Sequence, residues 1–360
     1  MFNEINIKTD LKHYPFPSIG QFSEVIYNVN HKTYYTGQDE NNNPVYDKSI
    51  ILPKIKFTGT VKCHGTNGGI IIDFANEIIY FQARNDVRTP VVDNAGFATY
   101  MSSVQENIVD MVKSNIDINS FDWSKNVFAI YGEWCGGNIQ GGIALNKLEK
   151  MFVIFAVAIV DIETKKKTWF SKEEVCRYKL NGKKVFNIYD FTTYEIEIDF
   201  SKHHETTNKL IEMTLAVEDY CPVGKNFGVE GIGEGIVFIP DEGKYRDSGF
   251  WFKSKGDKHS KSKVKVIKPV DNEKIAKLID IADKVTPSWR LEQIFNETFD
   301  TINGGKILRT KIGDYIKAVN KDIAKEETKT LVEAGVDFKD VAKYISKIVT
   351  DYFSMMEKEC

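Results

Sequence analysis

The stretch at residues 57–70, with the sequence FTGTVKCHGTNGGI, most constrains how this chain can fold. An alternating run over residues 55–61 leads into Lys62, which is followed by a polar segment rich in glycine. This pattern predicts a strand, a tight polar turn and a second strand. Lys62 is therefore expected at the end of a strand, facing whatever the turn encloses.

Strand patterns continue through the first 260 residues. Apolar runs that predict strands cover residues 70–74, 77–83, 127–134, 151–160, 236–239 and 250–255. Helices are expected over residues 97–112, 171–180 and 204–220. Residues 28–47 are mostly polar and contain the turn signal Asn43-Pro44, so they predict an inserted polar loop or an exposed hairpin.

From about residue 271 the pattern changes to helices without strands. At 360 residues the chain is long enough for two domains, expected at 1–270 and 271–360. The last helix has apolar residues three and four apart, with a row of lysines off that stripe: Lys339, Lys343 and Lys347.

Composition limits the class of protein. The net charge of -3 excludes a histone-like polycation, so any nucleic-acid contact must come from a local basic patch. Five scattered cysteines without a Cys-x-x-Cys pair argue against a disulfide framework or a zinc site, and for a reducing compartment. The sequence shows neither a secretory leader nor an apolar run of about 20 residues, so a cytoplasmic protein is expected.

Two glutamates and one arginine stand at strand ends. Glu133 ends an apolar run, where a buried carboxylate needs a metal, a ribose hydroxyl or a basic side chain as partner. Glu234 directly precedes an apolar strand, whereas Glu230 lies in a similar Glu-Gly pair without one. Arg84 follows a strand and could reach a phosphate or a ribose. For each of these residues, a surface ion pair or a solvated turn is the alternative.

The segment 250–255 is the most basic strand of the chain. Alternation places Trp251, Lys253 and Lys255 on one face. Two lysines beside an aromatic residue suit phosphate contacts, although a lysine run can also be a solvated tether.

Read in order, these segments resemble the motif series of the covalent nucleotidyltransferases. The series comprises Lys62-Cys63-His64-Gly65, Arg84, Tyr131-Gly132-Glu133, residues 152–157, Glu234-Gly235-Ile236-Val237 and Lys253-Ser254-Lys255. The fuller segment from Lys62 to Asn67 resembles the RNA ligase 2 family of phage-type ATP-dependent RNA ligases. The resemblance covers about residues 14–268.

The resemblance implies an α+β fold, with a nucleotidyltransferase (adenylation) domain of mainly antiparallel sheets followed by an all-α C-terminal domain that binds RNA. It implies ATP and Mg²⁺ (or Mn²⁺) as cofactors and a monomer that seals RNA 3′-hydroxyl and 5′-phosphate ends, in a nicked duplex or a broken tRNA. DNA ligases and capping enzymes instead carry an OB-fold after the last motif.

The resemblance also assigns roles to residues. Lys62 would be the adenylylated nucleophile, and Lys253 and Lys255 would contact the α-phosphate. Phe155 would stack on adenine, and Glu234 and Glu133 would hold the metal. The nucleotide-binding set that follows from the resemblance is Val61, His64, Gly65, Asn67, Arg84, Glu133, Phe155 and Glu234.

Two positions depart from the family pattern. Ala156 stands where an aspartate follows the stacking phenylalanine, and Ile239 stands near the position of a lysine that follows the second Glu-Gly. These two departures concern the ribose contacts and the handling of pyrophosphate or of the 5′-phosphate, and they leave the assignment of Lys62 as nucleophile unchanged. The alternatives are another covalent nucleotidyltransferase (a DNA ligase or a GTP-using capping enzyme) and an inactive RNA-binding protein on the same fold.

Overall fold

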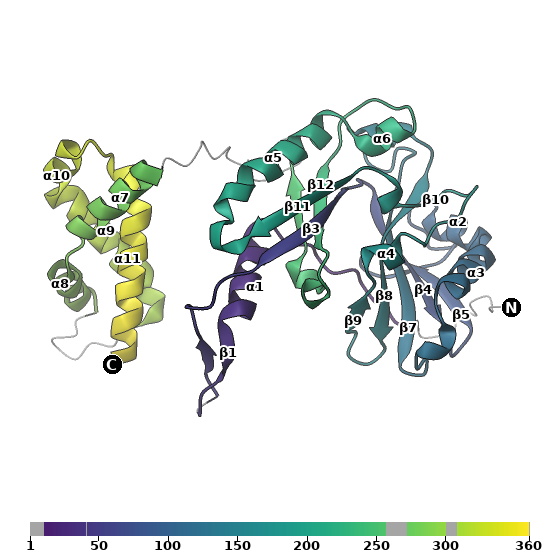
Figure 1. Cartoon of the computed structure of the whole chain (residues 1–360), viewed down its shortest axis with the longest axis horizontal. Coiled ribbons are helices and arrows are strands. Elements are labelled where there is room, and N and C mark those ends of the chain that lie inside the picture. The colour runs from purple at the N-terminus through teal and green to yellow at the C-terminus, as the bar shows by residue number, and fades with distance from the viewer. Residues whose placement is uncertain (1–10, 41, 257–271, 300–307, 360) are drawn as a thin grey trace. The chain divides into compact units, whose positions relative to one another are not determined.

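The computed structural model describes residues 11–40, 42–256, 272–299 and 308–359. The chain divides into two compact units, Met1–Val266 and Ile267–Cys360 (Figure 1). The first unit carries the strands, and the described residues of the second unit form helices. The basic residues that the sequence places at 257–268 lie outside the described residues.

Two sheets form the body of the first unit, and all their strand pairs but one are antiparallel. The larger sheet has the order β10-β8-β7-β4-β5-β6, with β9 also on β8. Its strands are β4 (Thr66–Asp73), β5 (Ile78–Gln82), β6 (Val87–Arg88), β7 (Asn126–Cys135), β8 (Met151–Asp161), β9 (Lys167–Trp169) and β10 (Val185–Asn187). The smaller sheet has the order β11-β3-β12-β13, from β11 (Thr193–Asp199), β3 (Lys54–Val61), β12 (Gly235–Pro240) and β13 (Phe252–Lys255). The expected α+β fold with mainly antiparallel sheets is confirmed.

Helices pack on the larger sheet, and an apolar core lies between them and the strands. Phe97 and Met101 of α2 (Phe97–Ser103) and Ile108 of α3 (Gln105–Asn115) are fully buried against residues of β4, β5, β7 and β8. The single helix expected over 97–112 is thus two helices. It breaks at Val104, whose backbone leaves the helical conformation while its side chain enters the core.

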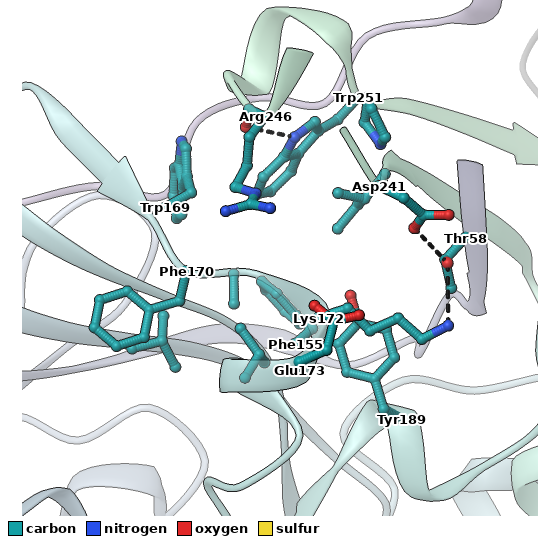
Figure 2. A pocket seen from close by; sticks show the side chains of 15 residues that line it. Thr58, Phe155, Trp169, Phe170, Lys172, Glu173, Tyr189, Asp241, Arg246 and Trp251 are labelled. Carbon is teal, nitrogen blue, oxygen red and sulfur yellow. Dashed lines mark hydrogen bonds between the residues drawn. The ribbon is translucent and has the colours of Figure 1, made fainter. Parts of the chain in front are cut away.

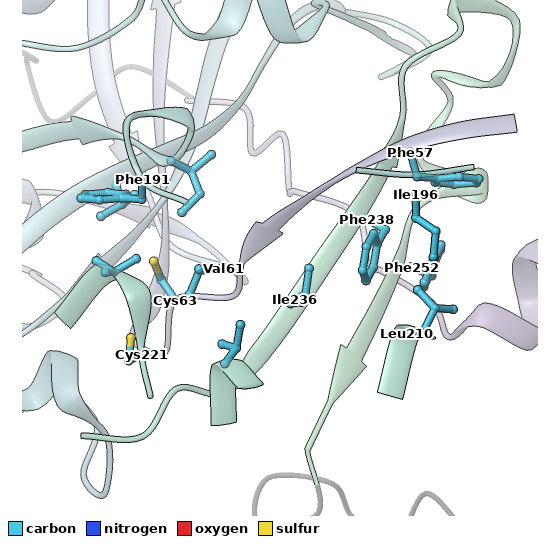
Figure 3. Close-up of a cluster of buried hydrophobic side chains, with 14 of the residues drawn as sticks. Phe57, Val61, Cys63, Phe191, Ile196, Leu210, Cys221, Ile236, Phe238 and Phe252 are labelled. Carbon is cyan, nitrogen blue, oxygen red and sulfur yellow. The ribbon is translucent and has the colours of Figure 1, made fainter. Parts of the chain in front are cut away.

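A second core lies under the smaller sheet, and Figure 3 shows part of it. Leu210 of α5 (His204–Asp219) packs there with Ile236 and Phe238 of β12 and Phe252 of β13. The helix expected over 171–180 is shorter: α4 covers only Lys172–Val175, although Ser171 and Glu174 form a capping box at its start. Beyond α4 the chain turns so that Tyr178 is buried in the other core.

The segment at 28–47, expected as a polar loop or an exposed hairpin, begins as a helix and continues as a hairpin. Residues 28–34 are the second half of helix α1 (Phe22–Tyr34), and a hairpin of β1 (Tyr35–Gln38) and β2 (Pro44–Tyr46) follows. The helix forms because Val25 and Val29, one turn apart, are fully buried against the core of the smaller sheet. The expected exposed hairpin is therefore present over residues 35–38 and 44–46, whereas the first seven residues of the segment are helical instead.

The second unit has its own core. Its helices are α7 (Asn272–Val285), α8 (Ser288–Phe299), α9 (Ile312–Glu326), α10 (Thr328–Glu333) and α11 (Phe338–Glu359). Phe295, Tyr315 and Ile345 are fully buried at its centre. Among the described residues, no helix combines the length and the apolar character that crossing a membrane would take.

Candidate active site

A cavity of about 430 Å³ is lined by residues of both sheets of the first unit. Its walls come from the β3–β4 turn, from β8, β12 and β13, and from residues 16–19 near the N-terminus. All eleven residues that the sequence nominated line this one cavity: Val61, Lys62, His64, Gly65, Asn67, Arg84, Glu133, Phe155, Glu234, Lys253 and Lys255. The fold therefore brings together residues from distant parts of the sequence.

The pairing of β3 with β12 places Lys62 beside Glu234. Val61 lies opposite Ile236 in this antiparallel pair, and the Lys62 amide donates to the Gly235 carbonyl at 2.8 Å. The two side chains thus leave neighbouring strand ends into the same cavity. Lys62 Nζ lies 2.7 Å from Glu234 Oε2.

Glu234 is the electrostatic centre of the cavity. Besides Lys62, it contacts His64 Nδ1 at 3.2 Å and Lys255 Nζ at 2.5 Å, and only 2% of its side chain is exposed. Burial alone would raise the pKa of Glu234, but the His64 hydrogen bond and the charges and hydrogen bonds of Lys62 and Lys255 outweigh it and hold the pKa well below its ordinary value. Glu234 is therefore a permanent anion among basic groups.

Glu133 lies on the opposite wall, where β7 pairs with β4. Its Oε1 accepts a hydrogen bond from the Gly65 amide at 2.8 Å. A side chain at position 65 would come within 2.2 Å of the Trp134 carbonyl oxygen, so glycine is required for this close approach. Burial raises the pKa of Glu133 to about 7, against the opposing effect of the Lys62 charge.

This raised pKa predicts a pH dependence of stability. The folded chain keeps the Glu133 proton up to about pH 7, whereas the unfolded chain loses it near 4.5. The folded state binds more protons in this window, so the contribution of Glu133 to the free energy of unfolding falls as pH rises. As pH rises from 5 to 8, the free energy of unfolding of the Glu133→Gln variant should increase by roughly 1–3 kcal/mol relative to that of the unchanged chain.

Urea unfolding at several pH values, with chelator and without nucleotide, measures this difference. The exposed Glu163→Gln serves as the matched control and should show no such trend. If the difference in free energy of unfolding between Glu133→Gln and the unchanged chain does not vary with pH, the raised pKa of Glu133 is contradicted.

Two further cations are held by the N-terminal segment. Lys253 Nζ donates to the Ile19 carbonyl at 2.6 Å, and Arg84 donates to Ser18 Oγ at 2.8 Å. Burial lowers the pKa of Lys253, and the nearby charges of Lys255 and Lys62 lower it further. Both cations are thereby fixed at the cavity wall by side chains and carbonyls that carry no charge.

The sequence did not nominate residues 16–19 for the site. The signal available was a proline-rich segment with aromatic residues but no strand or helix pattern. Phe16 packs against Phe155 with ring centroids 4.9 Å apart and against Trp251 at 6.1 Å. The three rings form an aromatic wall of the cavity, which is suited to the flat face of a base.

A smaller cavity of about 30 Å³ lies behind this wall (Figure 2). Phe155, Ile239 and Trp251 line both cavities. In the smaller one, Thr58 donates to Asp241 at 2.6 Å. The two positions that depart from the family pattern meet here: Ile239 belongs to the shared wall and Ala156 lines only the smaller cavity. Neither offers a polar side chain to the larger cavity.

The carboxylates of the site fit a divalent cation that arrives with a phosphate ligand. Within the described residues, no group of three or more His, Cys, Asp or Glu side chains is placed to hold a metal alone. Glu133 and Glu234 provide two carboxylates in the cavity. Mg²⁺ commonly uses one or two carboxylates together with substrate phosphates, and it retains several waters.

The chain was compared with known families and structures. A model of the RNA ligase family matches residues 55–255. A search of curated proteins returned no match.

Similar solved structures are those of Naegleria gruberi RNA ligase. A mutant with ATP and Mn is 17% identical over 68% of this chain and 57% of that chain, with a TM-score of 0.41. The structure with PPi is 19% identical over 70% and 61%, with a TM-score of 0.38. A mutant with AMP and Mn is 17% identical over 68% and 57%, with a TM-score of 0.41. The chain therefore matches less than two thirds of the length of these structures.

Proposed function

Since the chain belongs to the RNA ligase family, we propose that it joins RNA ends with ATP through a covalent lysyl-AMP and an RNA-adenylate, and that it acts in RNA repair. The observation that supports this most directly is the convergence of Lys62, Lys255 and His64 on the buried Glu234 at one cavity. A lysine at a strand end, among fixed cations, is the arrangement that nucleotidyl transfer requires.

In the first step the Lys62 amine attacks the α-phosphorus of ATP, a phosphorus–nitrogen bond forms and pyrophosphate leaves. An ammonium group has no lone pair for this attack, so Lys62 must first lose a proton. Glu234 Oε2 lies 2.7 Å from Lys62 Nζ and pairs with it. For Lys62 to act as the nucleophile, its ion pair with Glu234 must therefore break, and another cation must take its place beside Glu234.

A divalent cation would supply positive charge to the phosphates and to Glu234 when it is bound. Glu234 and Glu133 would hold it. Lys62, freed from the ion pair, would then be available to attack the phosphorus.

The remaining residues position the nucleotide. Lys253 and Lys255 share one face of β13 and can neutralise charge on the phosphate oxygens as the phosphoryl group transfers. Phe155 and its aromatic neighbours provide a stacking surface for the base. Arg84 and Glu133, which both come from the larger sheet or its strand ends, can hold the ribose or a phosphate.

The later steps use the same cavity. AMP passes from Lys62 to an RNA 5′-phosphate, and an RNA 3′-hydroxyl then displaces AMP to form the phosphodiester. Lys62 is regenerated, so the chain turns over with ATP as the energy source. We propose RNA with these two kinds of ends as the substrate, in a nicked duplex or a broken tRNA.

A direct experiment separates this proposal from its alternatives. The protein is incubated with α-labelled ATP or GTP and divalent cation, and then with nicked RNA duplex, nicked DNA duplex or single-stranded RNA. A labelled protein formed from ATP, followed by sealing of RNA, supports the proposal. Labelling from GTP would favour a capping enzyme, preferential sealing of nicked DNA a DNA ligase, and no labelling an inactive RNA-binding protein.

One variant tests the phosphate-binding strand. Lys255→Ala should slow formation of the labelled adduct by about 100-fold, because one fixed positive donor on the transferring phosphate is lost. The matched control is Lys54→Ala, since Lys54 pairs with Asp199 at 3.6 Å on the same sheet but does not line the cavity. The rate of adduct formation at saturating ATP is the measurement. If Lys54→Ala, Lys261→Ala and Lys255→Ala all lose activity equally, the lysines act only as a general tether.

A further inference from the structure

A buried threonine of β3 faces the larger cavity without a hydrogen-bond partner from the protein. Thr60 is only 4% exposed, yet it lines this cavity. Among the described residues, none forms a hydrogen bond with its hydroxyl. Taking a hydroxyl out of water without a partner costs free energy, so a buried group of this kind requires an explanation. The sequence did not nominate this residue.

Thr58, two residues earlier on the same strand, shows the usual arrangement. It is 1% exposed and lines the smaller cavity. Its hydroxyl donates to Asp241 at 2.6 Å and accepts from Lys172 at 3.3 Å (Figure 2). The two threonines are thus similarly buried, but only the hydroxyl of Thr58 has partners in the protein.

Alternation along β3 directs Thr60 to the same side of the sheet as Lys62. The core under the smaller sheet takes the odd-numbered residues Ile55, Phe57 and Val61. The even-numbered residues face the other side, where Thr58 lines the smaller cavity and both Thr60 and Lys62 line the larger one. Thr60 therefore lies about 7 Å along the strand from Lys62.

The register of the smaller sheet arranges this side in rows. Three rows cross β3 and β12, and they pair Lys62 with Gly235, Thr60 with Val237, and Thr58 with Ile239. The first row continues to Lys255 of β13 and carries the cations. The third row ends at Ile239, which borders the aromatic wall. Thr60 therefore lies between the cations that contact phosphates in the proposed function and the wall that is suited to a base.

We propose that the Thr60 hydroxyl binds the polar edge of the adenine base of ATP, an inference that rests on the proposed function. A base that stacks on the aromatic wall keeps its amine and ring nitrogens at its edge, where they need partners once water is excluded. A hydroxyl can donate one hydrogen bond and accept two, so it suits either kind of group.

The neighbours of Thr60 leave this task to it. Val237 and Ile239, the cavity-lining residues of β12 in its own row and the next, are apolar. The phosphates and the ribose already have charged candidates in the proposed function. Thr60 thus provides a neutral donor and acceptor beside the part of the cavity that suits a base.

The inference predicts opposite effects on stability and on nucleotide binding. Thr60→Val nearly keeps the shape of the side chain and removes the hydroxyl. Without nucleotide, this variant should melt at the same temperature as its parent chain or higher, because no hydrogen bond within the protein is lost. Its Kd for ATP should rise about 3- to 10-fold, because one hydrogen bond to the base is lost.

Binding is measured by isothermal titration calorimetry with ATP and Mg²⁺. All chains carry Lys62→Ala as a common background, so that the nucleotide is not consumed. Thr58→Val is the matched control on the same face of the same strand. It should melt at a lower temperature, because Asp241 and Lys172 lose a partner, and its Kd for ATP should stay within about twofold of the parent. Thr60→Ser keeps the hydroxyl and should bind ATP like the parent.

Base analogues test the contact itself. The triphosphates of purine riboside, 1-deazaadenosine and 7-deazaadenosine lack the exocyclic amine, N1 and N7, respectively. The analogue that lacks the partner of Thr60 should bind the parent and Thr60→Val with equal Kd, because the hydrogen bond is missing in both complexes. The other analogues should keep the difference between the two chains.

Three results would overturn the inference. The first is an unchanged Kd for ATP in Thr60→Val. The second is a full difference between the two chains with every base analogue. The third is a difference that disappears with 2′-deoxy-ATP, which would place the contact at the ribose.

The proposed function is tested separately, by adduct formation on the chain that keeps Lys62. If that chain forms the labelled adduct and Thr60→Val leaves the Kd for ATP unchanged, the inference alone fails. If it forms no adduct but Thr60→Val weakens ATP binding, the proposed ligation fails and the base contact stands. A chain that binds no ATP would overturn both.

Discussion

Replacing Lys62 with alanine is expected to abolish the labelled adduct formed with ATP. Lys62 follows the end of β3, where its amide donates to the Gly235 carbonyl, and its side chain lines the cavity. A nucleophile cannot be replaced by a neighbour that approaches the phosphorus from another direction, because transfer requires in-line geometry. The loss should exceed about 1,000-fold in adduct formed per unit time.

The adduct is measured by acid precipitation and gel electrophoresis after incubation with α-labelled ATP. Lys183→Ala, an exposed lysine that does not line the cavity, is the control and should label normally. Sealing of RNA that already carries a 5′-adenylate should be retained in part by Lys62→Ala, since that substrate bypasses the first step. A labelled, acid-labile adduct on the Lys62→Ala chain would show that another residue is the nucleophile.

Replacing Glu234 with glutamine should reduce adduct formation by at least about 100-fold. The neutral amide cannot balance Lys62, Lys255 and His64, and it offers a weaker ligand to a divalent cation. Removing one partner of a buried ionic cluster also leaves the others uncompensated, at a typical cost of about 3–5 kcal/mol. We therefore expect both slower chemistry and a lower melting temperature.

The chain contains its own control for this variant. Glu230 precedes a glycine in the same way as Glu234, but it is exposed and lies outside the cavity. Glu230→Gln should label with ATP at the normal rate and melt at the normal temperature. If Glu234→Gln labels as fast as Glu230→Gln at saturating metal, Glu234 has no part in the first step.

Much of the site could be predicted because the decisive residues stand at strand ends that local patterns define. Lys62 follows an alternating run, Glu234 precedes an apolar one, and Lys253 and Lys255 alternate on a short strand. Side chains two apart on a strand share a face whatever the tertiary structure, so the pairing of these two lysines could be predicted from the sequence alone.

Sequence patterns were less reliable where packing decides the local structure. Helix α1 forms through the burial of Val25 and Val29, and its second half lies in a polar segment that predicted a loop or a hairpin. Val104 interrupts an apparently continuous helical pattern because its side chain enters the core. In both places the contacts that stabilise the backbone come from residues distant in the sequence.

The sequence by itself determined which basic and acidic residues stand at strand ends, since residue type and local periodicity are properties of short segments. Only the tertiary structure decided that Glu234 accepts three basic side chains at once and that residues 16–19 complete the cavity wall. These features depend on strand register and on helix packing between segments far apart in the chain. Such pairings depend on the burial of whole apolar faces, and that burial cannot be deduced from any single segment.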